Sequence, residues 1–459
     1  MDELLMRLHI LTRTATFILL LMIAALFVIK LYFSGYLPGK KKKQPFKTAS
    51  LNSVNGLIFG KNRFGKIAYS PADDEGHCAV FGGSGSGKTS SILIPTLRHW
   101  SGTSLTIDIS GDISSNVDCP NKLIYEPGNP TSTPYNVFAL IDALEDTDEQ
   151  NEALEQLAFL IIPEQENANA NAKYFLDGGR NILSAALIAF YHTGADFIEI
   201  CRIILGNSYL DLFKRIKETE NKTAGFYISN FYGNSEQNVS GCKQSCDMAI
   251  KLFAVNKKIA NSIRRPICGE VAFSPETIET HNVFVLIPDD KRSVYSPLLH
   301  IITSQVLSYF STRSNKSKNN ILLCLDEFAS LGKLEITDAL RKLRKKHVRI
   351  LILTQNLSDI EDIYGRGAYK SMLSNFKYTV LLGIGETETQ EYFAKLIGRE
   401  DKKKESSTSA GILGGQISRT SSTEKDYIIQ PADLNRLGDS LILLHPDGYT
   451  KLRKAYYYK

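Results

Sequence analysis

The chain contains 459 residues, which is enough for two or more folding units around a large buried core. Hydrophobic residues make up 43% of it and charged residues 22%, and this composition excludes collagen-like, low-complexity and multi-span membrane proteins. The net charge of +5 is too small for so long a chain to indicate a polyanionic partner, so any basic surface must be local. The seven cysteines are odd in number and scattered, which argues against a disulfide framework and against a zinc ribbon.

An uncharged apolar segment runs over residues 15–29 and resumes after Lys30 as far as Leu37. Its length of about 23 residues suffices to cross a hydrocarbon core of ~30 Å, and we interpret it as a retained membrane anchor. A cleaved signal peptide is the alternative, but no small-x-small cleavage site follows the apolar run. Four lysines, Lys40 to Lys43, follow the segment, and the positive-inside rule then predicts a single-pass protein of the inner membrane whose remaining residues are cytoplasmic.

Short apolar runs rich in β-branched residues alternate with longer helical stretches after residue 70. The predicted strands are 78–81, 104–109, 122–125, 283–287, 321–325, 349–354, 378–383 and 440–444. Because these runs are continuously apolar rather than alternating, both of their faces must be covered, which predicts a largely parallel sheet between helices. We therefore expect an α/β fold.

The strand rhythm stops between about 140 and 270, where helical runs at 172–192 and 196–218 are followed by Asn/Gly breaks such as Gly206-Asn207 and Gly233-Asn234. This pattern predicts an all-α domain inserted into the α/β domain. The predicted organisation is an anchor at 1–39, a linker at 40–70, an α/β domain formed by 71–139 and 271–459, and the all-α domain at 140–270.

Two features are expected near the C-terminus. Residues 401–425 are lysine-, serine-, threonine- and glycine-rich and lack apolar side chains that could order them, so they predict a mobile surface loop. The turn residues Pro446-Asp447-Gly448 follow the last predicted strand and predict a hairpin.

The strongest motif is a complete G-x-x-x-x-G-K-[ST] P-loop at 82–89, between a predicted strand and a predicted helix. Its glycines let successive N–H groups turn toward phosphate oxygens, and the helix N-terminus adds positive potential. Lys88 is expected to reach the β and γ phosphates and the Thr89 hydroxyl to bind Mg²⁺, so ATP and Mg²⁺ are the predicted ligands. The predicted cradle consists of Gly82, Gly83, Ser84, Gly85, Ser86, Gly87, Lys88, Thr89 and Ser90. A glycine-rich turn without a ligand is the alternative.

Pro95 follows Lys88 by seven residues. It removes a backbone hydrogen bond, so we expect the helix to kink or tighten there.

A P-loop needs an acidic partner on a neighbouring strand, and the apolar run at 321–325 ends in Asp326 and Glu327. Asp326 is expected to hold Mg²⁺ through water, and Glu327 to orient or deprotonate the attacking water. A kinase acting on a small molecule has no need of a water-activating glutamate, so the pair favours hydrolysis and a motor. An ordinary acidic strand-end turn is the alternative.

The strand predicted at 349–354 ends in Gln355, which is expected to sense the γ-phosphate or the catalytic water; plain strand capping is the alternative.

The run at 341–349, which leads into this strand, contains six basic residues. Such a run is by default a solvated helix surface. The alternative is that one of its arginines reaches the γ-phosphate of a neighbouring subunit and ties hydrolysis to assembly.

With these motifs and the apolar N-terminal segment, the chain resembles the type IV secretion coupling proteins, the TraG/TraD-like conjugative ATPases. The resemblance covers most of 70–459 and is most specific over 326–365, where DE-F-x-x-LGK, the basic helix, the TQ strand end and the closing IYG occur at the family spacing. It implies a RecA-like P-loop domain that carries an all-α domain, with six copies forming a ring at the inner membrane. It also implies that Arg344 is the trans-acting arginine and Gln355 the motif glutamine.

The resemblance implies that this homo-hexamer receives a DNA–relaxase complex, or a protein substrate, and passes it to the type IV secretion channel with the use of ATP. The first hypothesis is an ATP-driven translocase of single-stranded DNA. The second is a membrane-anchored receptor that docks protein cargo, with ATP as an assembly switch. The third is a double-stranded DNA pump, which the residues around Asp326 disfavour.

This chain departs from the family pattern in three places. Many relatives have D-x-K-G-E after the second strand, where this chain has Asp108-Ile109-Ser110-Gly111-Asp112, so the role of that lysine does not carry over. Relatives often have two membrane helices around a periplasmic domain, whereas one is readable here. A long acidic C-terminal tail for relaxosome binding is also not expected.

Overall fold

The computed structural model describes residues 13–26, 45–109, 111–165, 169–365, 367–408 and 418–459. The chain divides into a unit over Met1–Pro45 and a compact unit over Phe46–Lys459. In the first unit residues 13–26 are helical and their side chains are exposed. Among the described residues, no helix combines the length and hydropathy required to cross a bilayer. The predicted anchor continues over 27–37, which lies outside the described residues.

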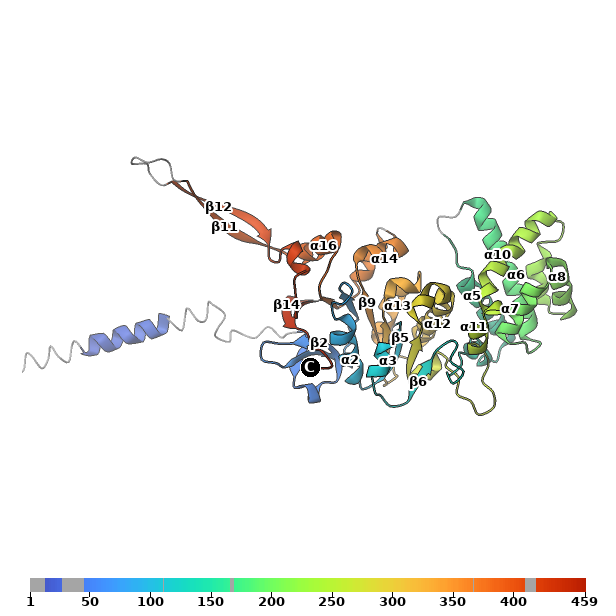
Figure 1. The fold of residues 1–459 in the computed structure, drawn as a ribbon, viewed down its shortest axis with the longest axis horizontal. Coiled ribbons are helices and arrows are strands. Elements are labelled where there is room, and N and C mark those ends of the chain that lie inside the picture. Colours follow the sequence, from blue (N-terminus) through green and yellow to red (C-terminus); the bar gives the residue numbers. More distant parts are fainter. Residues whose placement is uncertain (1–12, 27–44, 110, 166–168, 366, 409–417) are drawn as a thin grey trace, which may run out of the picture. The chain divides into compact units, whose positions relative to one another are not determined.

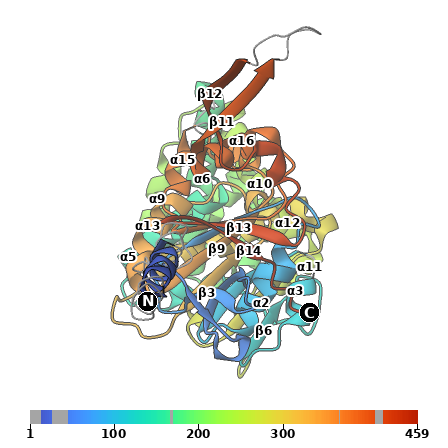
Figure 2. The same ribbon diagram turned by 90° about the vertical axis from the view of Figure 1, so that its left-hand side faces the viewer.

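One sheet organises the second unit. In chain order its strands are β1 (Lys47–Ala49), β2 (Gly56–Lys61), β3 (Ile67–Pro71), β4 (Cys78–Phe81), β5 (Thr103–Asp108), β6 (Lys122–Tyr125), β7 (Asn282–Leu286), β8 (Ile321–Leu325), β9 (Val348–Thr354), β10 (Tyr378–Leu381), β13 (Ser440–His445) and β14 (Gly448–Arg453). Their spatial order is β1-β3-β2-β14-β13-β10-β4-β9-β8-β5-β7-β6. The strands from β10 to β6 are all parallel. The remaining strands extend the sheet in antiparallel fashion and face the viewer in Figure 2.

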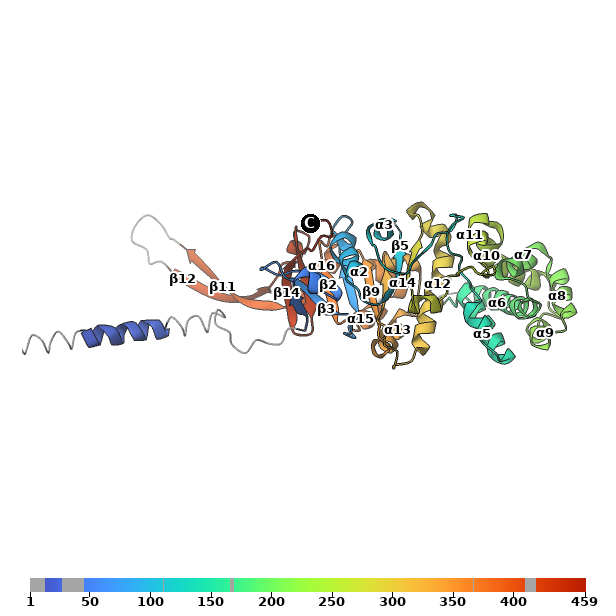
Figure 3. The same cartoon turned by 90° about the horizontal axis from the view of Figure 1, so that it is seen from below.

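Each predicted strand is present, with ends that differ by at most two residues, and the predicted α/β class with a largely parallel sheet is confirmed. Both faces of the sheet are covered at β4, β8 and β9, in which every residue is buried although the side chains of a strand alternate between the two faces. In β8, Leu322 and Cys324 pack with the helix that follows the P-loop, whereas Leu323 and Leu325 pack on the opposite face with α12 (Arg292–Thr312). Figure 3 shows helices on both sides of the strands.

In the described part of 147–262 the secondary-structure elements are helices, which turns connect. They are α5 (Thr147–Ile161), α6 (Ala170–Tyr191), α7 (Phe197–Gly206), α8 (Tyr209–Glu218), α9 (Lys222–Ser229), α10 (Glu236–Val255) and α11 (Lys257–Ser262). The chain leaves a helix at both predicted breaks, after α7 and before α10. Glycine lets α6 and α10 approach closely, since a Cβ on Gly178 would lie 2.3 Å from the Cys242 sulfur. Figure 1 shows these helices gathered beyond α12, which contacts α5.

The helices around the sheet include α2 (Ile94–Arg98), α3 (Asp112–Asn116), α4 (Ala139–Asp142), α13 (Ile336–Lys342), α14 (Leu357–Tyr364), α15 (Ala368–Leu373) and α16 (Thr387–Ile397). A π-helix, η2, over Thr89–Leu93 precedes α2, and Pro95 lies in the first turn of α2, where a missing N–H is tolerated. Of the kink or tightening expected at the proline, the tightening is not observed, because the helix widens just before it.

The prediction of a loop at 401–425 is wrong for residues 401–408 and 418–425, which form strands. β11 (Arg399–Thr408) and β12 (Ser418–Tyr427) form an antiparallel pair, while 409–417 lie outside the described residues. Backbone pairing and opposite charges replace an apolar face here: Asp401 is in register with Lys425, and the Lys402 ammonium lies 2.9 Å from the Asp426 carboxylate. The predicted C-terminal hairpin is confirmed by the pairing of β13 with β14.

Candidate nucleotide site

The predicted cradle begins where β4 ends, at the carboxyl edge of the parallel strands. Two backbone hydrogen bonds anchor it between neighbouring strands: the Gly82 N–H donates to Thr354 O at 3.2 Å, and the Gly83 N–H donates to Gly383 O at 2.7 Å. Gly85 and Gly87 have φ of 69° and 92°, in the left-handed region that favours glycine. Their positions explain why the loop can curl tightly before η2 begins at Thr89.

Two polar groups of the cradle are buried. Lys88 is 7% exposed, and its ammonium donates to Gly82 O at 2.7 Å and to Gly83 O at 3.3 Å. The Ser86 hydroxyl has no hydrogen-bond partner among the described residues, although it is buried. Buried polar groups without partners are rare in folded proteins. The loop thus contains donors that a polar ligand could engage.

Asp326 and Glu327 follow β8 at the same edge of the sheet. Asp326 is 7% exposed and accepts a hydrogen bond from the Glu327 N–H at 3.1 Å. Glu327 has a φ of 48°, an uncommon left-handed conformation for a residue other than glycine. It lies where the chain leaves the strand for the 3₁₀-helix Phe328–Leu331, and strained positions of this kind often occur at functional sites.

The charges of the two acids act on the P-loop lysine. Burial and the Glu327 charge raise the pKa of Asp326 to about 6, against the lowering effect of Lys88. Burial lowers the pKa of Lys88, while Glu327 and Asp326 oppose this shift. The two strand ends, far apart in sequence, therefore lie close enough for their charges to interact. A cation bound among them would relieve the buried carboxylate.

The strand order corrects one expectation. β8 is not the direct neighbour of β4, because β9 lies between them and pairs with both. Gln355, which follows β9, therefore stands between the P-loop and the acids. Its amide nitrogen lies 3.5 Å from each carboxylate oxygen of Glu327, so Gln355 can orient that carboxylate.

Two acidic residues near this edge were not selected from the sequence. Asp108, fully buried at the end of β5, accepts hydrogen bonds from Gly111 N–H at 2.8 Å and Ser114 N–H at 2.7 Å, and its charge contributes to the raised pKa of Asp326. Burial raises the pKa of Asp359, and its charge acts on Lys88. Asp108 ends the observed strand β5 and lies one residue before the end of the predicted strand 104–109, so an acidic residue at a strand end is the signal that would have identified it.

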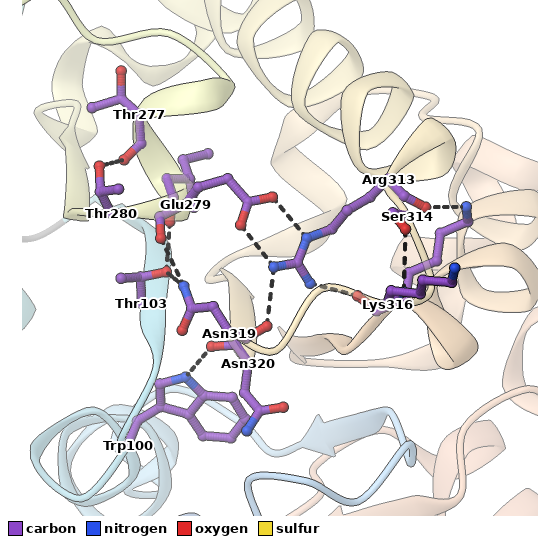
Figure 4. A network of polar contacts seen from close by, with 12 residues as sticks. Trp100, Thr103, Thr277, Glu279, Thr280, Arg313, Ser314, Lys316, Asn319 and Asn320 are labelled. Atoms are coloured by element: carbon purple, nitrogen blue, oxygen red, sulfur yellow. Dashed lines mark hydrogen bonds and ion pairs between the residues drawn. The ribbon is translucent and has the colours of Figure 1, made fainter.

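Arg344 does not join this group. It is exposed in the 3₁₀-helix Leu343–Lys346, which precedes β9 and so lies at the amino edge of the parallel strands, opposite the P-loop. The network of polar contacts in Figure 4 joins elements at this amino edge of the sheet. The Arg313 guanidinium there donates to both carboxylate oxygens of Glu279 at 2.7 Å, and also to the carbonyl of Lys346. Arg344 is therefore held away from the nucleotide site of its own chain.

The residues of this edge fit a magnesium nucleotide. The curled glycine loop and the unpartnered Ser86 hydroxyl suit phosphate oxygens, and the hard oxygens of Thr89 and Asp326 suit Mg²⁺. Glu327, oriented by Gln355, provides a carboxylate that can act on water. Together these groups can bind a nucleoside triphosphate and favour attack on its terminal phosphate.

The family model for type IV secretory system conjugative DNA transfer matches residues 40–459. The chain is 24% identical over 430 residues to Protein VirD4 of Agrobacterium fabrum, covering 89% of this chain and 63% of the relative. Its fold is similar to that of the bacterial conjugative coupling protein TrwBdeltaN70 in complex with sulphate, with a TM-score of 0.67 at 18% identity over 91% of this chain and 95% of that chain. It is also similar to the plasmid coupling protein TrwB in complex with ADP and Mg²⁺, with a TM-score of 0.66 at 18% identity over 91% and 96%. The chain spans about 60% of the length of the curated VirD4 relatives that it matches.

Proposed function

We propose that this chain, which belongs to the type IV secretory system conjugative DNA transfer family, is a coupling ATPase that uses ATP hydrolysis to move a substrate into a type IV secretion channel. The observation that carries the proposal is the meeting of the P-loop and the two acids at one edge of the sheet. Lys88 interacts electrostatically with Asp326 and Glu327 there. A glutamate positioned beside the phosphate site favours hydrolysis over binding alone.

ATP and Mg²⁺ are the proposed ligands. TrwB, whose fold this chain shares, is described in complex with ADP and Mg²⁺ and with a non-hydrolysable ATP analogue. In this chain the backbone of Gly82–Ser90 would hold the phosphates, and Thr89 and Asp326 would hold the metal. The bound Mg²⁺ would supply positive charge that stabilises the transition state. Lys88 would exchange its present carbonyl partners for phosphate oxygens, which requires only a rotation of its flexible side chain.

The chain's own carboxylate would act on the water. Glu327 accepts the proton or fixes the orientation of the attacking water, and Gln355 holds that carboxylate from the neighbouring strand. Arg344 of an adjacent subunit would complete the site, which makes a homo-hexameric ring the proposed active assembly.

The proposed substrate is single-stranded DNA carried with its relaxase. The ring would act at the inner membrane, held by the N-terminal apolar segment, and would pass the DNA to the components of the secretion channel. The family match and the VirD4 relatives support the role in type IV secretion. A basic channel would grip DNA through its phosphates, so binding should weaken as salt rises.

ATP hydrolysis by the purified full-length chain in detergent tests the proposal. We expect single-stranded DNA to stimulate hydrolysis several-fold, with the stimulation falling as salt rises, and we expect the Glu327→Gln variant to remain inactive throughout. Stronger stimulation by double-stranded DNA would favour a duplex pump. Hydrolysis that no DNA changes would favour a receptor for protein cargo in which ATP serves assembly.

A further inference from the structure

We propose that Tyr456 and Tyr458 form a stacking platform for the base of the bound nucleoside triphosphate. The inference rests on the proposed function, because it concerns the same bound nucleotide. It addresses the base, which lies at the opposite end of the nucleotide from the hydrolysed phosphate. These tyrosines follow β14 and belong to the last residues of the chain.

Backbone contacts place this segment beside the P-loop. The Tyr457 N–H donates to Ser90 O at 3.1 Å, at the start of the helix that follows the loop. A Cβ on Gly87 would lie 3.5 Å from the ring of Tyr456. The platform is therefore adjacent to two residues of the predicted cradle, although more than 360 residues separate them in sequence.

The segment is held firmly by groups outside the platform. The Arg98 guanidinium lies 4.8 Å from the Tyr457 ring centroid and donates to Tyr457 O at 3.3 Å. The Tyr456 hydroxyl donates to Asp439 Oδ1 at 3.2 Å. Tyr457 thus anchors the segment to α2. The rings of Tyr456 and Tyr458, on either side of it, do not take part in this contact with Arg98.

The two rings have the geometry of a stack. Their centroids are 5.2 Å apart with an interplanar angle of 29°, and Tyr458 is 59% exposed. The ammonium of Lys459 lies 4.4 Å from the Tyr456 ring centroid, so the ring already accepts a partner over its face. Because Lys459 is exposed and flexible, a nucleobase can replace that contact.

The position agrees with how a P-loop orients a triphosphate. Lys88 and the acids fix the β and γ phosphates, whereas the loop amides also reach the α phosphate, beyond which the ribose and base follow. Tyr456 lies at the Gly87 and Ser90 side of the cradle. Stacking reads the flat face of a base rather than its hydrogen-bonding edge, so we infer that ATP and GTP bind with similar affinity.

Equilibrium binding of ATP, GTP and inorganic tripolyphosphate to the full-length chain tests the platform. Tripolyphosphate occupies the phosphate cradle but has no base. We expect Tyr456→Ala to weaken ATP and GTP binding roughly tenfold while tripolyphosphate binding is unchanged. Tyr456→Phe, which keeps the ring, should bind all three ligands as the wild type does. Tyr458→Ala should show a smaller loss that is again confined to the nucleotides.

Three outcomes would overturn the platform: ATP binding unaffected by Tyr456→Ala, equal losses for ATP and tripolyphosphate, or a loss in Tyr456→Phe as large as that in Tyr456→Ala. Equal losses would mean that the ring only supports the loop. A wild-type chain that binds neither ATP nor tripolyphosphate would instead overturn the proposed function, so the two failures are distinguishable.

Discussion

Asp326 is a buried carboxylate whose charge the nucleotide-free protein disfavours. Burial and the neighbouring Glu327 raise its pKa to about 6 from the ordinary 3.8. Functional sites commonly contain groups of this kind, because the same burial that disfavours an isolated charge strengthens its attraction for a bound cation. The raised pKa of Asp326 is therefore what we expect of a carboxylate that takes part in the proposed Mg²⁺ site.

The stability of the metal-free protein should therefore depend on Asp326 with a defined sign. The folded protein keeps the proton up to about pH 6, whereas the unfolded chain loses it near 3.8. The contribution of this proton to the free energy of unfolding is complete below pH 3.8 and is lost as the pH rises through 6. The free energy of unfolding thereby changes by about 3 kcal/mol. Asp326→Asn should then raise the melting temperature at pH 7.5 in EDTA, and the gain should vanish toward pH 4. The exposed Asp118→Asn serves as control, and a gain independent of pH would contradict the assignment.

Lys88 and Glu327 have separable roles. We expect Lys88→Ala to lose both ATP binding and hydrolysis, because the ammonium belongs to the phosphate cradle. Glu327→Gln should lose hydrolysis by at least a hundredfold and keep ATP binding, because the variant removes only the group that acts on water. Binding and turnover are measured on the same preparations. Equal loss of ATP binding in both variants would contradict the separation.

At the scale of elements, sequence patterns located the parallel strands because buried parallel strands are continuously apolar. β4, β6 and β8 were predicted with their observed ends. The strands β1, β2 and β3 at the antiparallel side were not selected. For β1 the reason is that a short polar strand such as Lys47–Ala49 carries no such signal, whereas the buried apolar run of β2 does carry it and was missed. The pair β11–β12 was missed for a related reason: charge pairing and backbone hydrogen bonds stabilise it without an apolar face.

The candidate site was predictable in its residues but not in its arrangement. The P-loop, Asp326 and Glu327 are local patterns, so the sequence contains them in full. The order of the strands depends on long-range pairing, and nothing local indicates that β9 separates β4 from β8. The position of Asp108 was not predictable for the same reason, because it lies near Asp326 only through the pairing of β5 with β8.

The amino-edge network of Figure 4 makes a prediction about the helices and loops that it joins. The Arg313 side chain is 3% exposed, and its removal would leave Glu279 and the carbonyls of Asn319 and Lys346 without this partner. We expect Arg313→Ala to lower the free energy of unfolding by about 3–5 kcal/mol. Urea unfolding can follow the fluorescence of Trp100, the only tryptophan, which bonds to Asn320 O in the same network.

A matched control is the exposed ion pair of Arg292 with Asp289, whose charged atoms lie 3.6 Å apart. Arg292→Ala should change the free energy of unfolding by less than about 1 kcal/mol. Similar changes in the free energy of unfolding for the two substitutions would mean that the buried ion pair of Arg313 stabilises the protein no more than an exposed one.

For the whole molecule, the decisive feature is that the proposed nucleotide site and the arginine proposed to act in trans lie at opposite edges of the sheet. The P-loop and acids lie at the carboxyl edge, and Arg344 is exposed near the amino edge. A single chain cannot bring Arg344 to its own nucleotide without rebuilding the sheet. A ring, in which the edge of one subunit faces the site of the next, would allow the contact and would couple hydrolysis to assembly.

Mixed assemblies test this arrangement. Arg344→Ala alone should hydrolyse ATP poorly, and so should Glu327→Gln alone. In a mixture, some Arg344→Ala subunits keep an intact site and receive the arginine from a Glu327→Gln neighbour, so part of the activity should return. Arg341→Ala, in the same exposed basic segment, is the control and should remain active. An inactive mixture would place Arg344 on the solvated surface instead.

The most direct test of the central claim is electron paramagnetic resonance of Mn²⁺ in place of Mg²⁺, measured with the full-length chain and ATP. We expect one bound Mn²⁺ per chain, coupled to ³¹P of the nucleotide, with binding that weakens about 10- to 100-fold in both Thr89→Ala and Asp326→Asn and is unchanged in Asp118→Asn. Mn²⁺ binding that depends on Thr89 but is indifferent to Asp326 would show that the two strand ends do not share one metal–nucleotide complex.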